Sequence, residues 1–386
     1  MPDSPTPGRS VIVTRPVRRR PTFHALPVSA VDQLTDDALA ITFQVPEPLR
    51  DTFRFRAGQH LTVRRIDPDT GEDVRRSYSI CSTPAELGET GRLRIGVKVL
   101  PSGAFSQYAA NKLAVGDEVE VMPPLGHFTT DFDPARTRRY GGIVAGSGIT
   151  PVLSLIATGL AIEPHSTFTL FYGNRSTRSV MFVEELADLK DRWPDRLQVV
   201  HVLSREPGEA ELLSGRIDAQ RLPRLLDTFA PHPVDEWFLC GPYGMVLDAR
   251  EVLIERGVPE EAVRTELFHV PSAEPEPGAG SSLSAAAPRA DATAGEVEVT
   301  IRLDGRESTF TMGRQERVLD AALRVRGELP YSCRGGVCST CRARVVEGKV
   351  QMATNWALEP DEVAAGYVLT CQSSPVTDRL VVDYDV

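Results

Sequence analysis

Long apolar runs are missing from this chain of 386 residues. No stretch approaches the ~20 consecutive apolar residues of a membrane-spanning helix, and the N-terminus lacks the apolar core of a secretory signal peptide. Cysteine is scarce too, with six in all, which suits a reducing compartment better than a disulfide scaffold. We therefore expect a cytoplasmic protein without a membrane segment.

Several kinds of catalytic machinery are also absent. The seven histidines are scattered without the spacing of a metal-binding motif, and we find neither a Ser–His–Asp set nor a general acid–base constellation. A formal net charge of −10 at pH 7 argues against general nucleic-acid binding, although it can bias the choice of a basic protein partner. The sequence therefore offers no site of its own for hydrolysis or for a substrate-bound metal ion.

Four of the six cysteines form a pattern near the C-terminus. Cys333, Cys338 and Cys341 follow the spacing C-x4-C-x2-C, and Cys371 comes after 29 further residues. This is the plant-type ferredoxin spacing, which supplies four thiolates to one [2Fe–2S] cluster. A zinc site usually carries two C-x2-C pairs, and disulfide scaffolds suit short secreted chains, so we favour the cluster over both.

The remaining sequence changes its periodicity along the chain. Residues 23–133 hold short alternating strands between turn signals, which predicts an antiparallel β-barrel. Residues 138–269 alternate strands with helices, which predicts a doubly wound parallel α/β sheet. Residues 270–295 are mostly Pro, Ala, Gly, Ser and Glu, and we interpret them as a flexible linker. Residues 296–386 predict a small α+β domain around the cysteine loop, and the Arg-rich residues 1–22 a disordered arm.

Two motifs in the first region suit a bound flavin. Arg76–Ser79 (Arg-Ser-Tyr-Ser) places an arginine, an aromatic ring and a hydroxyl along one strand, and the planar fork of an arginine can grip a pyrophosphate. Gly103–Ser106 (Gly-Ala-Phe-Ser) is a small-residue turn that enters a helix and can present backbone amides to phosphate. Alone, each is equally typical of strand surface or of a helix cap, but their order and separation favour a flavin site.

Two glycine turns in the second region suit a nucleotide. Gly146–Pro151 (Gly-Ser-Gly-Ile-Thr-Pro) joins a strand to a helix, so a phosphate or ribose can approach the backbone there. Cys240–Met245 (Cys-Gly-Pro-Tyr-Gly-Met) repeats this arrangement after the last strand, and two such turns would line one crevice. The first turn is equally compatible with a purely structural role, and Cys240 with that of a buried structural cysteine. We expect helices at residues 150–161, 180–191, 215–226 and 244–256.

The ends of the second and third strands of this region bear on the choice of nucleotide. Tyr172–Arg178 includes Arg175 and no acidic residue, and the third strand ends in Ser204 and Arg205. An NAD-selective site usually carries Asp or Glu at the second strand's end, whereas Arg accommodates a 2′-phosphate. We therefore predict NADPH rather than NADH; the alternative is that these arginines are solvated loop charges.

Taken together, the motifs resemble the ferredoxin–NADP reductase superfamily with a C-terminal plant-type ferredoxin domain, over about residues 23–386. Arg75–Cys81, Val121–Phe128, Tyr331–Glu347 and Gly366–Ser373 resemble most the reductase subunits of bacterial phenylacetyl-CoA epoxidases, which serve phenylacetate degradation. The resemblance implies an FAD-binding barrel, an NADP-binding domain and a β-grasp ferredoxin domain. It also implies a partner, the di-iron oxygenase component that accepts the electrons.

The resemblance further implies roles for individual residues. FAD would be held by residues of the first region, namely Arg76, Tyr78, Ser79, Lys98, Gly103, Ala104, Phe105 and Ser106. The nucleotide would be held by residues of the second region, namely Gly146, Gly148, Thr150, Arg175, Ser204, Arg205, Cys240 and Gly241. Thr150 and Cys240 would face the nicotinamide and Tyr78 the flavin, as catalytic residues. Glu266 and Phe268 would lie near the flavin.

The expected cofactors form a series because of their electron counts. NADPH gives up a hydride, two electrons at once, whereas a [2Fe–2S] cluster takes one electron at a time. A flavin accepts two electrons and releases them singly, so it must stand between them. We predict flow from NADPH to FAD to the cluster and on to an oxygenase, which oxidises the substrate on another polypeptide. The acceptor can instead be a Rieske, steroid or alkane hydroxylase, and a redox-sensing [2Fe–2S] flavoprotein is the alternative from a different class.

Overall fold

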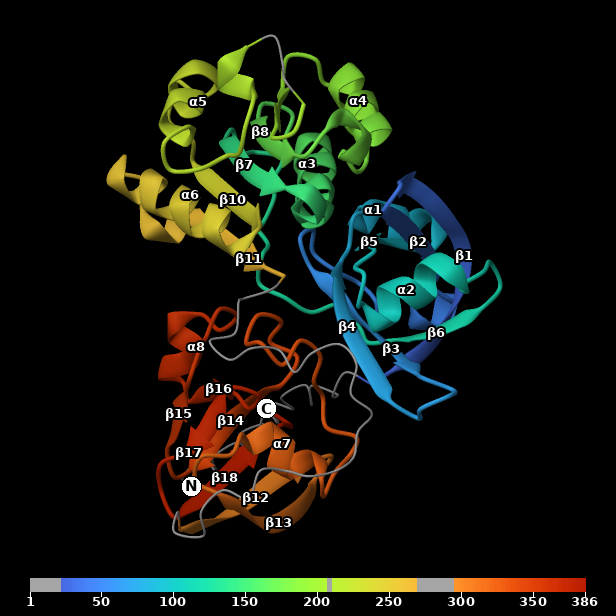
Figure 1. The fold of residues 1–386 in the computed structure, drawn as a ribbon, viewed down its shortest axis with the longest axis vertical. Coiled ribbons are helices and arrows are strands. Elements are labelled where there is room, and N and C mark those ends of the chain that lie inside the picture. The colour runs from blue at the N-terminus through green and yellow to red at the C-terminus, as the bar shows by residue number, and fades with distance from the viewer. Residues whose placement is uncertain (1–21, 207–209, 269–294) are drawn as a thin grey trace, which may run out of the picture.

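A computed structural model describes residues 22–206, 210–268 and 295–386. The expected N-terminal arm up to residue 21 and the expected linker up to residue 294 lie outside the described residues. Figure 1 shows a barrel in blue and cyan, a sheet with helices in green and yellow, and a C-terminal domain in orange and red. The β-barrel, the parallel α/β sheet and the α+β ferredoxin domain that the sequence predicts are confirmed. In the described ranges, no helix is both long and apolar enough to cross a bilayer.

The barrel is built from six antiparallel strands in the order β4-β3-β6-β1-β2-β5. A bridge between Ile80 and Ile95 joins the two ends of this sheet and closes the barrel. Apolar side chains at every second strand position, such as Leu61 and Val63, fill the interior. The elements are β1 (His24–Thr35), β2 (Ala38–Gln44), β3 (His60–Ile66), β4 (Asp73–Ser79), α1 (Pro84–Thr90), β5 (Arg92–Lys98), α2 (Ala104–Asn111) and β6 (Glu118–Val121).

The middle domain is a five-stranded parallel sheet in the order β11-β10-β7-β8-β9. The chain moves outward from β7 to β9 and then returns to the other side of β7 with β10. Ligands of such sheets bind where the strand order reverses, beyond the carboxyl ends of the strands. The elements are β7 (Arg139–Ala145), α3 (Ile149–Ile162), β8 (Thr167–Asn174), α4 (Val183–Arg192), β9 (Leu197–Leu203), α5 (Leu222–Phe229), β10 (Glu236–Gly241), α6 (Tyr243–Glu255) and β11 (Val263–Leu267).

Two expected helices begin later than the sequence indicates. The one expected over residues 180–191 starts at Val183. The helix expected over residues 215–226 starts only at Leu222. Gly215 has a φ of +127° and donates its amide to the carbonyl of Leu203, which holds this residue beside β9. Asp218 then accepts a hydrogen bond from the backbone N of Arg221 at 2.8 Å and forms a turn. Local turn chemistry therefore overrides the apolar pattern on which the expectation rested.

The C-terminal domain is a mixed sheet in the order β13-β12-β18-β14-β16, with β12 and β18 parallel. Helix α7 packs its buried Val318, Leu319 and Ala322 into the core of this domain. Strands β15 and β17 form a separate pair beside the cysteine loop, which connects α7 to β14. The elements are β12 (Glu296–Leu303), β13 (Arg306–Gly313), α7 (Val318–Leu323), β14 (Arg342–Glu347), β15 (Val350–Met352), α8 (Pro360–Ala364), β16 (Tyr367–Leu369), β17 (Ser373–Pro375) and β18 (Arg379–Asp383).

Candidate functional site

Edge strand β4 brings two of the predicted motifs together. Its side chains alternate between two faces, and Arg76 and Tyr78 share one of them. Arg76 is exposed, while Tyr78 is half-buried against Phe105 of α2, with ring centroids 5.6 Å apart. Burial raises the pKa of the Tyr78 hydroxyl, so this ring stays neutral. The Arg76–Ser79 and Gly103–Ser106 motifs therefore lie side by side, as a single flavin site would require.

The backbone at the start of α2 can be approached closely by a phosphate group. A Cβ on Gly103 would lie 2.2 Å from Ser106 Oγ, so a side chain there would have to displace the serine. Ser106 Oγ accepts a hydrogen bond from the backbone N of Leu100 at 3.2 Å, which fixes the turn. The first amides of the helix have no intrahelical partner and can meet a phosphate. Phe105 is only 1% exposed, so its backbone rather than its ring is available to a cofactor.

Asp37, in the turn between β1 and β2, contacts two of the predicted site residues. Lys98 Nζ forms an ion pair with its carboxylate. Arg175, from the middle domain, interacts electrostatically with the same group. Lys98 is therefore engaged by Asp37 in this structure, and a contact between Lys98 and FAD would have to share its ammonium group with that carboxylate.

The two glycine turns of the middle domain abut one another. A Cβ on Gly148 would lie 2.1 Å from the carbonyl oxygen of Cys240, so only glycine allows this approach. Gly146 has a φ of +55°, and its carbonyl accepts a hydrogen bond from the Tyr172 hydroxyl at 3.0 Å. Thr150 is buried and donates to the carbonyl of Ser147 at 2.8 Å. The two turns thus pack against each other at the point where the strand order reverses; that they line a nucleotide site stays a prediction.

Glu266 on β11 joins the barrel to the middle domain. Ser79 Oγ donates a hydrogen bond to Glu266 Oε2 at 3.0 Å, and Cys240 Sγ lies 4.0 Å from the same oxygen. Burial raises the pKa of Glu266 to about 8, although the Ser79 hydrogen bond opposes this shift. Burial, together with the nearby Glu266 carboxylate, also raises the pKa of the Cys240 thiol. Phe268, the other residue expected here, is 41% exposed.

His60 is a neighbour of this group that the sequence analysis missed. It pairs with Ser79 across the β3–β4 ladder, and its Nδ1 lies 3.9 Å from Glu266 Oε1. Burial lowers the pKa of His60 to about 4, although an interaction with the Cys338 backbone opposes this shift. No local signal in the sequence marks His60, because its surroundings come from three different domains.

Arg175 and Arg205 lie together at the carboxyl ends of β8 and β9. Both are exposed, and the backbone N of Arg205 donates to the carbonyl of Arg175 at 2.7 Å. Ser204 is half-buried beside them. An acidic residue also lies here: Glu206 accepts hydrogen bonds from the backbone N and the hydroxyl of Thr177, at 2.7 and 3.0 Å. The backbones of the two arginines are therefore adjacent at this edge of the sheet.

The four cysteines of the C-terminal loop form two pairs. The thiol of Cys333 lies beside that of Cys338, and the thiol of Cys341 beside that of Cys371. The Cys338 thiol lowers the pKa of Cys333 to about 7, whereas its neighbour and burial raise the pKa of Cys338. Within the described ranges no three His, Cys, Asp or Glu side chains are placed to hold one metal ion. Two pairs of thiolates suit a two-iron cluster, whose positive irons would offset the charge of all four.

The backbone around these cysteines is also suited to a cluster. Arg334 and Gly336 adopt positive φ values of 53° and 77°, which curl the loop tightly. The amide of Gly335 points at Cys333 Sγ at 3.4 Å, and Gln372 Nε2 at Cys371 Sγ at 3.7 Å. Donors aimed at sulfur are a feature of iron–sulfur sites, where they help to set the reduction potential.

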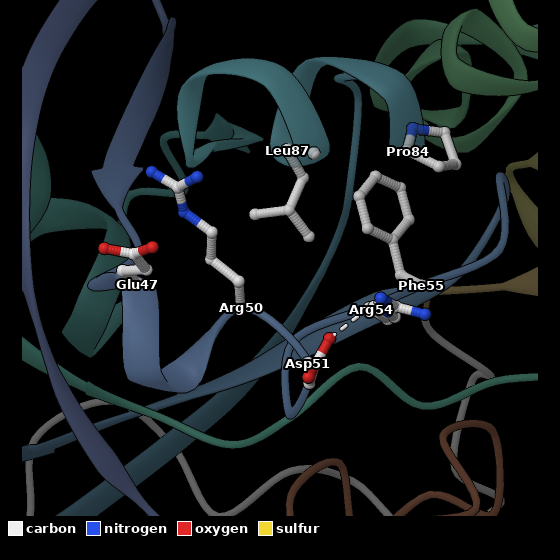
Figure 2. Close-up of a pocket in the computed structure, with 8 residues that line it drawn as sticks. Glu47, Arg50, Asp51, Arg54, Phe55, Pro84 and Leu87 are labelled. Atoms are coloured by element: carbon white, nitrogen blue, oxygen red, sulfur yellow. Dashed lines mark ion pairs between the residues drawn. The ribbon is translucent and has the colours of Figure 1, made fainter.

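A surface pocket of about 510 Å³ lies elsewhere on the barrel (Figure 2). It is open to solvent and lies between α1 and the segment that connects β2 to β3. Figure 2 shows Arg50 and Leu87 on opposite sides of it, with Asp51 paired to Arg54 at its rim. None of the predicted site residues lines this pocket, so we do not assign the candidate site to it.

Comparison with known families covers all three domains. Models of an oxidoreductase FAD-binding domain, an oxidoreductase NAD-binding domain and a 2Fe-2S iron-sulfur cluster binding domain match residues 25–130, 143–251 and 301–376. One of the subunits of 1,2-phenylacetyl-CoA epoxidase from Escherichia coli (strain K12) is 45% identical over 94% of this chain and 98% of its own length. The ferredoxin reductase component of 3-ketosteroid-9-alpha-monooxygenase from Rhodococcus rhodochrous is 36% identical over 93% of this chain and 96% of its own.

Among solved structures, phthalate dioxygenase reductase has the same fold. It aligns with a TM-score of 0.55 and 23% identity, over 94% of this chain and 98% of its own. The chain therefore belongs to the family of flavoprotein reductase components of oxygenases that join an FAD-binding barrel and an NAD-binding domain to a C-terminal [2Fe–2S] ferredoxin domain.

Proposed function

We propose that this chain is the cytoplasmic NADPH-dependent reductase of a phenylacetyl-CoA 1,2-epoxidase, and that it passes electrons from NADPH through FAD and a [2Fe–2S] cluster to the di-iron oxygenase component. The observation that carries this proposal is the 45% identity to one component of such an epoxidase across nearly the whole of both chains. Steroid monooxygenase is a second candidate acceptor, because the reductase component of that system is 36% identical over a similar span.

FAD fits the face of β4 that carries Arg76 and Tyr78. Arg76 would hold the pyrophosphate and Tyr78 would lie against the flavin ring, while the amides at the start of α2 would meet phosphate. Bound flavin accepts two electrons from the nicotinamide and releases them one at a time. On the middle domain, the nicotinamide nucleotide would approach the backbone at Gly146, where an added Cβ would meet no atom within 4 Å.

At this site we propose that Glu266 holds a proton, that Ser79 is hydrogen-bonded to the carboxyl that holds it, and that Cys240 excludes water. Because burial raises the pKa of Glu266 to about 8, its carboxyl holds a proton near neutral pH. Ser79 Oγ is hydrogen-bonded to that carboxyl and belongs to the strand that also carries Tyr78. A proton held at Glu266 therefore has the Ser79 hydroxyl next to it, at the end of the strand that carries Arg76 and Tyr78. Cys240 adds a neutral, buried thiol that keeps water from the same oxygen.

NADPH is proposed over NADH because of Arg175 and Arg205. Two exposed guanidinium groups joined through their backbones offer a 2′-phosphate two charge-assisted contacts, and Ser204 adds a hydroxyl beside them. The carboxylate of Glu206 could favour a 2′-hydroxyl, but it is already hydrogen-bonded to the amide and hydroxyl of Thr177. The cluster itself would be held by Cys333, Cys338, Cys341 and Cys371.

Replacing one cluster cysteine tests the proposed order of transfer. Cys338→Ser should lose the cluster absorbance and the reduction of the oxygenase component, yet its flavin should still be reduced by NADPH. Cys81→Ser is the matched control, because Cys81 is equally buried but lies outside the cysteine loop, just after the end of β4. Full reduction of the oxygenase by Cys338→Ser would contradict the proposal. Comparing the phenylacetyl-CoA and steroid oxygenase components as acceptors then decides between the two candidates.

A further inference from the structure

The second face of edge strand β4 is covered by the ferredoxin domain. Arg75 and Ser77 alternate with Arg76 and Tyr78 along the strand, so they point away from the proposed flavin face. Thr62 of β3 pairs with Ser77 in the ladder, and their hydroxyls lie 3.4 Å apart on this second face. In Figure 1, β3 and β4 lie on the side of the barrel nearest the C-terminal domain. We call Thr62, Arg75 and Ser77 the docking face.

Each residue of the docking face contacts the cysteine loop or the segment that leads into it. Arg75 Nη1 donates to the carbonyl of Leu329 at 2.8 Å, and Ser77 Oγ donates to Ser332 Oγ at 2.9 Å. Thr62 Oγ1 lies 3.4 Å from Thr340 Oγ1. These partners flank the cluster cysteines: Ser332 precedes Cys333, and Thr340 precedes Cys341. The cluster loop is therefore placed directly against the barrel strand that carries the flavin motif.

Arg75 is the most strongly held member of this face. Its side chain is only 2% exposed and forms a two-pronged ion pair with Asp73, at 3.1 and 2.7 Å. Its guanidinium lies 4.1 Å from the centre of the Tyr331 ring, a cation–π contact between two buried side chains. Because Asp73 fixes the guanidinium in advance, little side-chain entropy is lost when Tyr331 and Leu329 approach.

The ferredoxin domain also contacts the reductase domains elsewhere: Val337 packs against the core of the middle domain, and the Cys338 backbone interacts with His60. Trp356 meets Tyr243 of α6 edge to face, with ring centroids 5.8 Å apart, and Trp356 remains 38% exposed. Arg264 of β11 lies 4.0 Å from Glu359. Neither of these last two contacts involves the cysteine loop. The docking face supplies the side-chain hydrogen bonds that hold the cluster loop and the segment before it against β3 and β4.

We propose that the docking face is the surface on which this chain's own ferredoxin domain receives electrons, and that Arg75 and Tyr331 are positioning residues for that step. The proposal rests on the proposed function, because it requires flavin on the Arg76 and Tyr78 face. The step moves one electron across a single strand: reduced flavin loses one electron, and the oxidised cluster gains it. No bond forms or breaks, so geometry and separation control the rate.

The proposal is tested in the protein loaded with both cofactors, by anaerobic rapid mixing with NADPH. Flavin bleaching reports the first step, and cluster bleaching reports the second. Arg75→Met and Tyr331→Leu should each slow the second step by at least about tenfold, the scale of one desolvated cation–π contact, and leave the first step unchanged. Tyr331→Phe keeps the ring and should restore the wild-type rate. The paramagnetic resonance spectrum of the reduced cluster should be the same in all variants.

Arg65→Met is the matched control for these variants. Arg65 also lies in the barrel and stacks on an aromatic ring, that of Tyr108 at 4.3 Å, but its ion pair is with Asp67 of the same domain. If Arg65→Met slows the second step as much as Arg75→Met does, or if Tyr331→Leu transfers at the wild-type rate, the docking proposal is overturned. If Arg75→Met fails to load its cofactors, the rate of the second step in Tyr331→Leu tests the docking proposal by itself. Failure of NADPH to reduce the wild-type flavin would instead overturn the proposed function.

Discussion

Ser79 donates a hydrogen bond to Glu266 over 3.0 Å, and this bond joins the edge strand of the barrel to the edge strand of the parallel sheet. Two domains thereby enclose one carboxyl group, whose side chain is only 11% exposed. The same contact places Cys240, at the end of the neighbouring strand, 4.0 Å from the carboxyl oxygen. An ionisable group at such a junction makes the packing of the two domains sensitive to pH.

Replacement of Glu266 by glutamine should change how stability depends on pH. Burial raises the pKa of Glu266 in the folded protein to about 8, above its ordinary value of 4.5. Between these pH values the folded state holds a proton that the unfolded state has released, so stability falls as pH rises. Below pH 4.5 both states hold the proton on Glu266, so this group no longer lowers the stability. Glu266→Gln cannot ionise, so wild type should lose stability relative to the variant between pH 5 and pH 8.

Thermal unfolding of both proteins at pH 5 and at pH 8 measures this effect. The gap in melting temperature between Glu266→Gln and wild type should move in favour of the variant at the higher pH. A gap that stays constant with pH would mean that Glu266 titrates in the folded protein as it does in the unfolded chain.

Replacement of Arg205 by alanine should shift the nucleotide preference. A hydrogen bond to a charged group is worth about 1.5–3 kcal/mol, so the KM for NADPH should rise by about tenfold to a hundredfold. The KM for NADH should stay the same, because NADH has no 2′-phosphate. Arg178→Ala is the control: Arg178 lies in the loop that follows β8, three residues beyond Arg175, but is exposed and directed toward Asp36, at 3.8 Å. An equal loss for NADPH and NADH in Arg205→Ala would contradict the assigned role.

The cluster ligands and the secondary structure could be predicted from the sequence, because both depend on the spacing of residues within short segments. Cluster ligation requires the C-x4-C-x2-C spacing, and the structure brings Cys333 to Cys338 and Cys341 to Cys371. The period of apolar residues identified the barrel and the parallel sheet, because strand alternation and helix amphipathicity are properties of short segments. The same reasoning misplaced the start of α5, where Gly215 and Asp218 set the backbone instead.

Contacts between domains could not be predicted in this way. The surroundings of His60, Arg75 and Tyr331 form only when the barrel and the ferredoxin domain pack together. The residues next to them in the sequence give no sign of these contacts. Lys98 was expected to serve FAD from its position in the family pattern, whereas its pairing with Asp37 depends on a turn about 60 residues earlier. Phe105 was grouped with a phosphate turn, yet its ring belongs to the barrel core.

The two glycines of the first nucleotide turn should respond differently to alanine. Gly148→Ala would place a Cβ 2.1 Å from the Cys240 carbonyl, so the strands must shift and both stability and nucleotide binding should fall. Gly146→Ala meets no atom within 4 Å, and its cost is that of a φ of +55°, about 1–2 kcal/mol. Melting temperature and NADPH affinity should therefore drop further in Gly148→Ala. Equal losses in the two variants would show that backbone conformation, and not the approach of Cys240, makes glycine necessary.

The most direct test of the account is anaerobic stopped-flow absorbance of the fully loaded protein, mixed first with NADPH and then, in a separate experiment, with NADH. We predict that the flavin bleaches before the cluster and that both bleach faster with NADPH. Bleaching of the cluster before the flavin would contradict the order of transfer. No bleaching with either nucleotide would contradict the assignment of reductase activity altogether.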